Sequence, residues 1–492
     1  MSDYILAVDQ STQGTKALLF DRAGCLLKRA DVPHRQLVNE QGWVEHDPQE
    51  IYSNTLQAVK LVVEQAGIDK GSIRALGISN QRETALVWER SSGRPVYHAI
   101  VWQCARGAGI CQRLEAAGKA ELVRANTGLA LSPYFSAAKI AWVLENVEGA
   151  AEQAKNGELC CGTMDSWLVY RLTGGKQFRT DYSNASRTQL FHIRKLSWDE
   201  EVCGLFGVPT QCLAKVTDSD GYYGETDLDG FLDKAIPICG VMGDSSGALF
   251  GQGCWETGMT KATYGTGSSV MMNIGKQPVL CSQAVTSLAW GLGGTVSYVL
   301  EGNINYTGAV VTWMKDELHL IDTPSQTQEL ARQANPKDQT YLVPAFSGLG
   351  APYWDSRARA VFYGMSRTTG RAELVKAGLE SIGYQITDVL QAMEEEAKIV
   401  VKELRADGGP TKNAYLMQFQ SDMAQLPVYV PKDEELSGIG AAYVAGLAAG
   451  VYQKETLFDN RKYTQVAPLM NEEERERKYQ GWKEAVCAAL KK

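Results

Sequence analysis

The chain has 492 residues, too many for one ordinary hydrophobic core, so we expect two large domains. Its 44% hydrophobic and 22% charged content is typical of a globular protein, and a net charge of -8 without a basic stripe argues against nucleic acid as a partner. No run of about 18 apolar residues is present to cross a membrane, and residues 1–10 lack the pattern of a signal peptide.

The 11 cysteines are scattered along the chain, and no CxxC pair occurs among them. This spacing fits neither a disulfide framework nor a zinc site. We therefore expect reduced thiols and a cytoplasmic location.

The first predicted elements are three strands at residues 4–9, 16–21 and 26–32. Asp9 ends the first strand and opens a polar loop, residues 10–16, that carries Gly14. A buried strand thus places one carboxylate beside backbone N–H groups and hydroxyls. Such a site can hold a metal through the acid and phosphates through the donors.

Further along the first half, helices alternate with strands. A helix is predicted at 47–65, where Asp47 can act as the N-cap and Pro48 suits the first turn. Strands follow at 74–79 and 236–244, and the second of these again ends in an acid, Asp244. The alternation predicts α/β layers. We place a domain boundary near residue 248, giving domains at 1–248 and 249–492.

The second half repeats the features of the first. A loop of glycines and hydroxyls at 263–269 leads into a strand, within a group of strands at 262–273, 286–290 and 296–301. A long amphipathic helix is predicted at 371–397. Two loops of this kind, half a chain apart, indicate a duplicated architecture that closes on one nucleotide.

Known nucleotide motifs are absent, since neither GxxxxGK[ST] nor a complete GxGxxG occurs. Residues 243–247 satisfy the GxSxG pattern of a serine hydrolase, but only His319 follows them as a triad partner. A second alternative is an actin-like module that binds ATP without transferring phosphate. The hydrolase would leave the two loops of glycines and hydroxyls unexplained, and Asp244 argues against a module that only binds ATP.

Longer stretches of sequence carry a resemblance to a known family. They are GWVEHDPQEI (42–51), GISNQRET (77–84), IVWQCAR (100–106), SPYFSAAKIAW (132–142) and VPAFSGLGAPYWD (343–355). Over nearly the whole chain the sequence resembles the FGGY carbohydrate kinases, and within them the members that act on glycerol. The resemblance implies two actin-like, ribonuclease H-like ATPase domains with a catalytic cleft between them.

The resemblance also implies roles for individual residues. Asp244 matches the catalytic base, and Asp9 matches the acid that organises Mg²⁺. The positions that match the substrate site are Arg82, Glu83, Trp102, Tyr134, Asp244 and Ser245. The positions that match the ATP site are Thr12, Gln13, Gly14, Lys16, Thr266, Gly267, Gly308, Thr312, Gly409 and Asn413.

Ser245 and Ser269 depart from the glycerol-type pattern, in which Gln and Phe are usual. Both replacements are small and polar, so a longer polyol or ketose such as erythritol, xylulose or ribulose is an alternative substrate. We expect an ATP- and Mg²⁺-dependent kinase that phosphorylates a terminal hydroxyl of glycerol or of a closely related small polyol. The resemblance further allows a homodimer or homotetramer.

Overall fold

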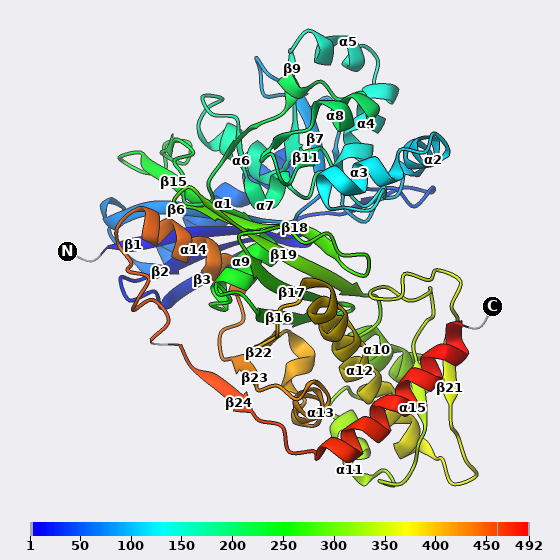
Figure 1. Cartoon of the computed structure of the whole chain (residues 1–492). Helices are drawn as coiled ribbons and strands as arrows, with labels where there is room; N and C mark the ends of the chain where they lie inside the picture. The colour runs from blue at the N-terminus through cyan, green and yellow to red at the C-terminus, as the bar shows by residue number, and fades with distance from the viewer. Residues whose placement is uncertain (1–2, 460, 491–492) are drawn as a thin grey trace.

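A computed structural model describes residues 3–459 and 461–490. The first half of the chain forms a six-stranded sheet in the order β14-β15-β6-β1-β2-β3 (Figure 1). Strand β1 is antiparallel to β2 and parallel to β6. The strands are β1 (Tyr4–Gln10), β2 (Gly14–Phe20), β3 (Leu26–Pro33), β6 (Ile73–Asn80), β14 (Glu225–Thr226) and β15 (Ile236–Gly243).

The second half forms a seven-stranded sheet in the order β18-β19-β17-β16-β22-β23-β24. Strand β16 is antiparallel to β17 and parallel to β22. The strands are β16 (Met259–Tyr264), β17 (Ser268–Gly275), β18 (Val285–Leu292), β19 (Thr295–Ile304), β22 (Glu403–Asp407), β23 (Val428–Pro431) and β24 (Tyr463–Val466).

The two sheets share one five-stranded plan. The order β3-β2-β1-β6-β15 in the first half corresponds to β19-β17-β16-β22-β23 in the second, with the same pattern of antiparallel and parallel pairs. The hairpin between β1 and β2 and the hairpin between β16 and β17 are the two predicted phosphate loops. The duplicated α/β architecture predicted from the sequence is therefore confirmed.

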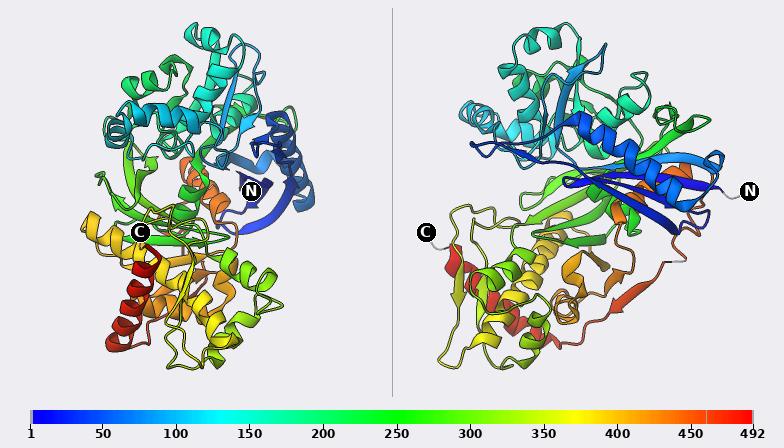
Figure 2. Two further views of the ribbon diagram at one scale, coloured as in Figure 1. Left: turned by 90° about the vertical axis from the view of Figure 1, so that its right-hand side faces the viewer. Right: turned by 180° about the vertical axis from the view of Figure 1, so that it is seen from behind.

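The helices repeat in the same way. Helix α1 (Pro48–Ala66) lies between β3 and β6 in the chain, and α12 (Arg371–Ala397) lies between the corresponding strands β19 and β22. Figure 2 shows α1 lying across the strands of the first sheet. The side chain of Asp47 accepts a hydrogen bond from the Gln49 N–H (2.8 Å), which confirms the predicted N-cap.

Helices α9 (Asp244–Gly251) and α14 (Leu436–Ala448) follow the last strand of each plan and pack against each other. A Cβ on Gly440 would lie 1.9 Å from the carbonyl oxygen of Gly247, so the two backbones meet in direct contact. Figure 1 shows α14 alongside β1 and β6 of the first sheet. The first sheet is thus covered by a helix from the second half. The domain boundary near residue 248 stays a prediction.

A further sheet, β4-β5-β8-β7-β9, lies in the first half beyond the six-stranded one. It is built from β4 (Leu37–Val38), β5 (Val44–His46), β7 (Ala85–Glu89), β8 (Ala99–Ile100) and β9 (Leu159–Thr163). Helices and short strands around it are α2 (Ala108–Ala116), α3 (Ala120–Thr127), α4 (Ser136–Asn146), α5 (Ala150–Lys155), α6 (Met164–Leu172), β10 (Arg179–Asp181), α7 (Tyr182–Ala185), β11 (Phe191–His192), β12 (Ser197–Trp198), α8 (Glu200–Leu205) and β13 (Lys215–Thr217).

The second half is completed by elements on the outer side of its sheet (Figure 1). They are α10 (Gly308–Asp316), α11 (Gln326–Gln333), β20 (Tyr341–Val343), β21 (Val361–Tyr363), α13 (Ala414–Ala424) and α15 (Glu472–Leu490). Helix α15 is fastened to α12 by Asp388, which accepts hydrogen bonds from the hydroxyl of Tyr479 and the indole N–H of Trp482. None of the helices within the described residues is both long and apolar enough to cross a membrane.

Candidate functional site

Asp9 lies near the end of β1 and is buried. Among residues 3–459 and 461–490, its Oδ1 has no hydrogen-bond partner. Burial raises the pKa of Asp9 to about 6; Lys16 opposes this rise, and the charge of Asp244 adds to it. The two strand-end acids predicted from the sequence are therefore near enough to interact electrostatically.

The hairpin between β1 and β2 is tight, with the Ser11 N–H donating to the carbonyl oxygen of Gly14 (2.9 Å). Its Thr12 hydroxyl accepts a hydrogen bond from the indole N–H of Trp102 (2.9 Å). A predicted phosphate-loop residue and a predicted substrate residue are thus in direct contact. A Cβ on Gly14 would lie 2.8 Å from the carbonyl oxygen of Val32, which explains the glycine there.

Two other residues of this hairpin differ in their surroundings. Gln13 is exposed at the tip of the loop. Lys16 lies within β2, and its Nζ forms an ion pair with Glu435 from the second half (2.7 Å). Arg29 contacts the same carboxylate. The resemblance assigned Lys16 to phosphate, and its ion pair with Glu435 is a contact that local sequence did not reveal.

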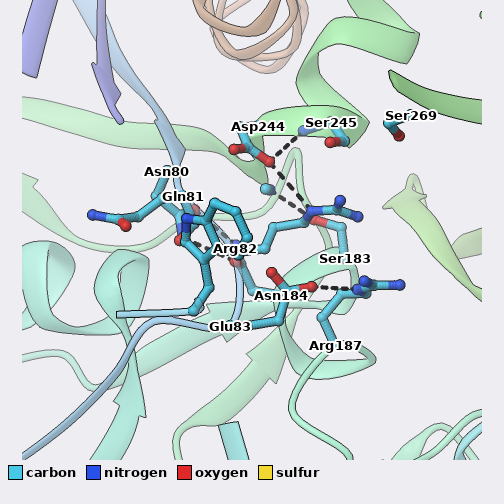
Figure 3. Close-up of polar contacts among 12 residues, drawn as sticks. Asn80, Gln81, Arg82, Glu83, Ser183, Asn184, Arg187, Asp244, Ser245 and Ser269 are labelled. Atoms are coloured by element: carbon cyan, nitrogen blue, oxygen red, sulfur yellow. Dashed lines mark hydrogen bonds and ion pairs between the residues drawn. The ribbon is translucent and has the colours of Figure 1, made fainter. Parts of the chain in front are cut away.

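Arg82 and Glu83 follow β6, and each is paired to a different buried residue; Figure 3 shows the pair of Glu83 with Arg187. The two Nη atoms of Arg82 donate to the two carboxylate oxygens of Glu301, each at 2.8 Å. Glu83 accepts a hydrogen bond from Nε of Arg187 at 2.5 Å. Arg187 also forms an ion pair with Glu301 at 3.2 Å. All four side chains are buried.

Glu83 has a backbone φ of 60°, in the left-handed region that non-glycine residues rarely adopt. Its carbonyl oxygen accepts a hydrogen bond from the hydroxyl of Ser136 (3.0 Å), and the Thr84 N–H donates to the carbonyl of Arg82 (2.7 Å). Such backbone strain costs about 1–3 kcal/mol and persists where the surroundings fix it, often at functional sites. After this turn, Arg82 reaches Glu301 and Glu83 reaches Arg187, and these two partners contact each other.

Asp244 is the first residue of α9 and the most accessible carboxylate of the site, with 39% of its side chain exposed. Its Oδ1 accepts a hydrogen bond from the N–H of Ser245 (2.6 Å) and forms an ion pair with Nε of Arg82 (3.2 Å). The preceding Gly243 N–H donates to the hydroxyl of Ser183 (2.8 Å). Figure 3 shows Asp244 and Arg82 pointing toward one another.

Trp102 and Tyr134 form an edge-on pair with ring centroids 5.6 Å apart. Burial raises the pKa of the Tyr134 hydroxyl. The backbone carrying Tyr134 is held by the ammonium group of Lys139, which is fully buried and donates to the carbonyl oxygens of Pro133 (2.7 Å), Tyr134 and Phe135 (3.2 Å). The two aromatic residues thus form one wall beside Thr12, a residue predicted to belong to a phosphate loop.

A cavity of about 520 Å³ lies in the second half between α10, α11, α12 and the 409–413 segment. Gly308, Thr312, Gly409 and Asn413, four positions predicted to bind ATP, all line it. Apolar side chains such as that of Leu416 also line it. A cavity of this size and polarity can hold a nucleoside.

The second hairpin, residues 265–267, lies next to this cavity. The N–H groups of Gly308 and Ala309 donate to the carbonyl oxygens of Gly265 (2.9 Å) and Thr266 (3.1 Å). A Cβ on Gly267 would lie 2.3 Å from the carbonyl oxygen of Ile304, so only glycine fits there. The positions of the second half that are predicted to bind ATP are therefore neighbours in the structure.

The residues that sequence reasoning missed are Glu301, Arg187, Lys139 and Glu435. Glu301 lies in β19, between the apolar residues Val299 and Leu300 and Gly302. A single acid beside apolar residues of a strand indicates a buried charge, and a buried charge needs an oppositely charged partner. Nothing in the local sequence identifies Arg82 and Arg187 as those partners.

Asp9 was predicted to organise Mg²⁺. Within the described residues, no cluster of three or more His, Cys, Asp or Glu side chains is placed to hold a metal. Mg²⁺ in phosphoryl-transfer sites usually takes only one or two carboxylates together with substrate phosphates. The unpartnered Oδ1 of Asp9 fits such a site.

Comparison with known proteins shows the family of this chain. Residues 4–251 match the N-terminal domain and residues 260–449 the C-terminal domain of the FGGY family of carbohydrate kinases. Glycerol kinase 1 of Thermotoga maritima is 49% identical, with 99% of each chain covered. A glycerol kinase of Alkaliphilus oremlandii is 46% identical over all of this chain and 98% of its own.

Solved structures of kinases are similar to this chain over nearly its whole length. The glycerol kinase of Plasmodium falciparum with ADP superposes with a TM-score of 0.94 at 33% identity, over 100% of this chain and 99% of its own. A xylulose kinase of Lactobacillus acidophilus shares the fold with a TM-score of 0.88 at 21% identity, over 99% and 97% of the two chains. The serine hydrolase alternative is therefore excluded. The chain belongs to the FGGY family of carbohydrate kinases and is a phosphotransferase with an alcohol acceptor.

Proposed function

We propose that this kinase transfers the γ-phosphoryl group of ATP to a terminal hydroxyl of glycerol. The relatives that support this acceptor are glycerol kinases at 46% and 49% identity. The observation that carries the proposal is the position of Asp244, an accessible carboxylate at the start of α9 whose charge also acts on Asp9. Asp244, the proposed base, is thus close to Asp9 at the start of the proposed phosphate loop.

The acceptor would be held by the residues around Arg82. Each Nη of Arg82 carries two N–H groups and uses one for Glu301, so donors remain for a hydroxyl oxygen. Glu83 supplies an acceptor for a hydroxyl hydrogen. The rings of Trp102 and Tyr134 would contact the C–H groups of the polyol. These groups match a small molecule with adjacent hydroxyls.

In the transfer step, the acceptor oxygen forms a bond to the γ-phosphorus while the bond from that phosphorus to the β,γ-bridging oxygen breaks. Asp244 accepts the proton of the attacking hydroxyl, and ADP leaves with the bonding electron pair. The Arg82 contact keeps Oδ1 of Asp244 in place. Catalysis then depends mainly on aligning the two reactants and stabilising charge.

The nucleoside of ATP would occupy the cavity beside Gly308 and Gly409, with the phosphates reaching toward the hairpins at Thr12 and Thr266. Bound Mg²⁺ would neutralise charge on the phosphate oxygens, and Asp9 is the residue that would hold it. Glycine at 308 permits close packing against the second hairpin, because a Cβ there would lie 2.7 Å from the carbonyl oxygen of Gly265.

The experiment that tests the proposal is a coupled ADP-release assay with glycerol, dihydroxyacetone, erythritol, xylulose, ribulose and gluconate. We expect the highest kcat/KM with glycerol. Asp244→Asn should lower kcat by about 10²–10⁴-fold while ATP binding is kept, because a positioned base contributes about that much. Asp199→Asn is a control, since Asp199 directly precedes α8 and its carboxylate accepts hydrogen bonds from the Val202 N–H and from Asn126, neither of which is assigned to the site. Absence of acceptor-dependent ADP release would favour a binding module.

A second acceptor class is favoured by Ser269, whose hydroxyl lies 3.3 Å from a carboxylate oxygen of Glu301. A small polar side chain at this position, together with Ser245, leaves a polar surface near Arg82 that additional CHOH units could contact. A four- or five-carbon polyol or ketose is therefore the alternative. Higher kcat/KM for erythritol or xylulose than for glycerol in the same assay would select it.

We also propose that the reaction takes place in the cytoplasm, where ATP is supplied. The assembly into a homodimer or homotetramer stays a prediction. Size-exclusion chromatography with light scattering would measure it directly.

A further inference from the structure

Glu301 is a buried carboxylate that the second half contributes to the acceptor side of the site. It lies on β19, and only 1% of its side chain is exposed. It accepts two hydrogen bonds from Arg82, and Arg187 forms an ion pair with it. Both arginines belong to the first half of the chain. The contact therefore joins the two halves at the place where the acceptor would bind.

The charges around Glu301 depend on one another. Burial alone would raise the pKa of Glu301, but Arg187 and Arg82 hold this pKa well below its usual range. The two guanidinium groups face the carboxylates of Glu301, Glu83 and Asp244. Without Glu301, both arginines would have to share the remaining two acids. Arg82 would then be drawn more strongly to Asp244.

The geometry of the Arg82 contact is specific. Because both Nη atoms are bound to Glu301, the guanidinium plane is fixed in a bidentate arrangement. This orientation leaves Nε facing Oδ1 of Asp244 at 3.2 Å. Glu301 also reaches Glu83 through Arg187. One side chain thus sets the positions of three residues assigned to the acceptor and the base.

We infer that Glu301 is a positioning residue for phosphoryl transfer, supplied by the second half to an acceptor site built mainly by the first. This inference rests on the proposed function. It predicts that losing the Glu301 carboxylate impairs acceptor binding and turnover while the nucleotide cavity is unaffected. A purely structural ion pair would instead change only stability.

The test uses the full-length enzyme with Glu301→Gln. Glutamine keeps the shape but replaces one carboxylate oxygen with an amide donor that faces an arginine donor. We expect the KM for the acceptor to rise about tenfold and kcat to fall about tenfold, each equivalent to about 1.4 kcal/mol. The KM for ATP and the basal ATP hydrolysis without acceptor should stay within about twofold of the wild type.

Glu380→Gln is the matched control. Glu380 is also a buried glutamate that contacts two lysines, Lys376 (3.6 Å) and Lys478 (3.8 Å), and it accepts a hydrogen bond from Tyr415. It lies outside the acceptor site. We expect this variant to lower the melting temperature while all kinetic constants of the folded enzyme stay unchanged.

Glu301→Asp keeps the charge but shortens its reach by one methylene, and it serves if Glu301→Gln does not fold. We expect acceptor KM and kcat for Glu301→Asp between those of the wild type and of Glu301→Gln, with at least a threefold rise in KM. Acceptor KM and kcat within twofold of the wild type in either variant, or an equal rise in the KM for ATP, would overturn the inference. Failure of the proposed function would show separately, as a wild-type enzyme that does not turn over glycerol.

Discussion

Lys139 is a buried lysine that fastens the segment carrying Tyr134, and its replacement by methionine tests how far that segment positions the acceptor site. The ammonium group donates to three consecutive carbonyl oxygens, those of Pro133, Tyr134 and Phe135. Methionine has a similar length and no donor. Lys139→Met therefore removes these hydrogen bonds with little change in volume.

The size of the effect follows from the protonation state of Lys139. Burial lowers the pKa of this lysine to about 7, so charged and neutral forms are similarly populated near neutral pH. Between two and three N–H groups then donate, and each bond contributes about 1 kcal/mol net. We expect Lys139→Met to lower the free energy of unfolding by about 2–3 kcal/mol at pH near 7. The KM for glycerol should rise several-fold because Tyr134 is less firmly held.

The effect should also depend on pH. Native Lys139 releases its proton near pH 7, whereas an unfolded lysine keeps it to about pH 10.4. In this window the unfolded state binds more protons, so raising the pH stabilises the native wild type, by up to about 1.4 kcal/mol per pH unit. The difference in unfolding free energy between wild type and Lys139→Met should therefore grow from pH 7 to about pH 8.5.

Urea unfolding at several pH values, combined with steady-state kinetics, measures both effects. Lys376→Met is the control, because Lys376 is a largely buried lysine that pairs with Glu380 away from Tyr134. It should leave the KM for glycerol unchanged. A Lys139→Met enzyme with wild-type KM, or a stability difference that does not change with pH, would refute the reasoning.

Three more changes have defined outcomes. Thr12→Val removes the acceptor of the Trp102 indole N–H, and we expect a 2- to 10-fold rise in the KM for glycerol, from the loss of about 0.5–1.5 kcal/mol, measured by steady-state kinetics. Asp388→Asn should lower the free energy of unfolding by about 1–3 kcal/mol, measured by urea unfolding. Because burial raises the pKa of Asp388 to about 6, the difference in unfolding free energy between the wild type and this variant should shrink as the pH rises from about 4 to 6. A difference that grows over this range would contradict the prediction. Gly308→Val places a Cβ 2.7 Å from the carbonyl oxygen of Gly265. We expect the KM for ATP to rise at least about tenfold while the KM for glycerol is unchanged, measured by steady-state kinetics. Isothermal titration with ATP should show correspondingly weaker binding.

Local patterns in the sequence were sufficient to predict most elements of both sheets. The helix predicted at 371–397 has the bounds of α12, because its apolar positions recur with helical spacing and a glycine precedes it. The strand predicted at 16–21 begins earlier, at Gly14, since the hairpin is closed by a hydrogen bond from the Ser11 N–H to the Gly14 carbonyl. Strand ends depend on such turn contacts, which composition does not reveal.

Pairings between distant residues could not be predicted in the same way. Arg82 and Glu301 are 219 positions apart, and Lys16 and Glu435 are 419 apart. No local periodicity connects such residues, because their contact exists only once the two sheets are packed. The sequence therefore predicted Asp9, Arg82 and Asp244 as site residues but not the partners that orient them.

Contacts that cross between the halves differ in how easily they can change. The pair of Glu301 with Arg82 is buried, and breaking a buried ion pair costs about 3–5 kcal/mol, because an unpaired charge remains. In the Lys16–Glu435 pair 29% of the lysine side chain is exposed, whereas the Glu435 side chain is 8% exposed and is also paired with Arg29. If Lys16 leaves this pair, Glu435 therefore keeps Arg29 as a partner, whereas Glu301 and Arg82 have to separate from a bidentate contact. The contact at Arg82 is therefore the more costly of the two to break.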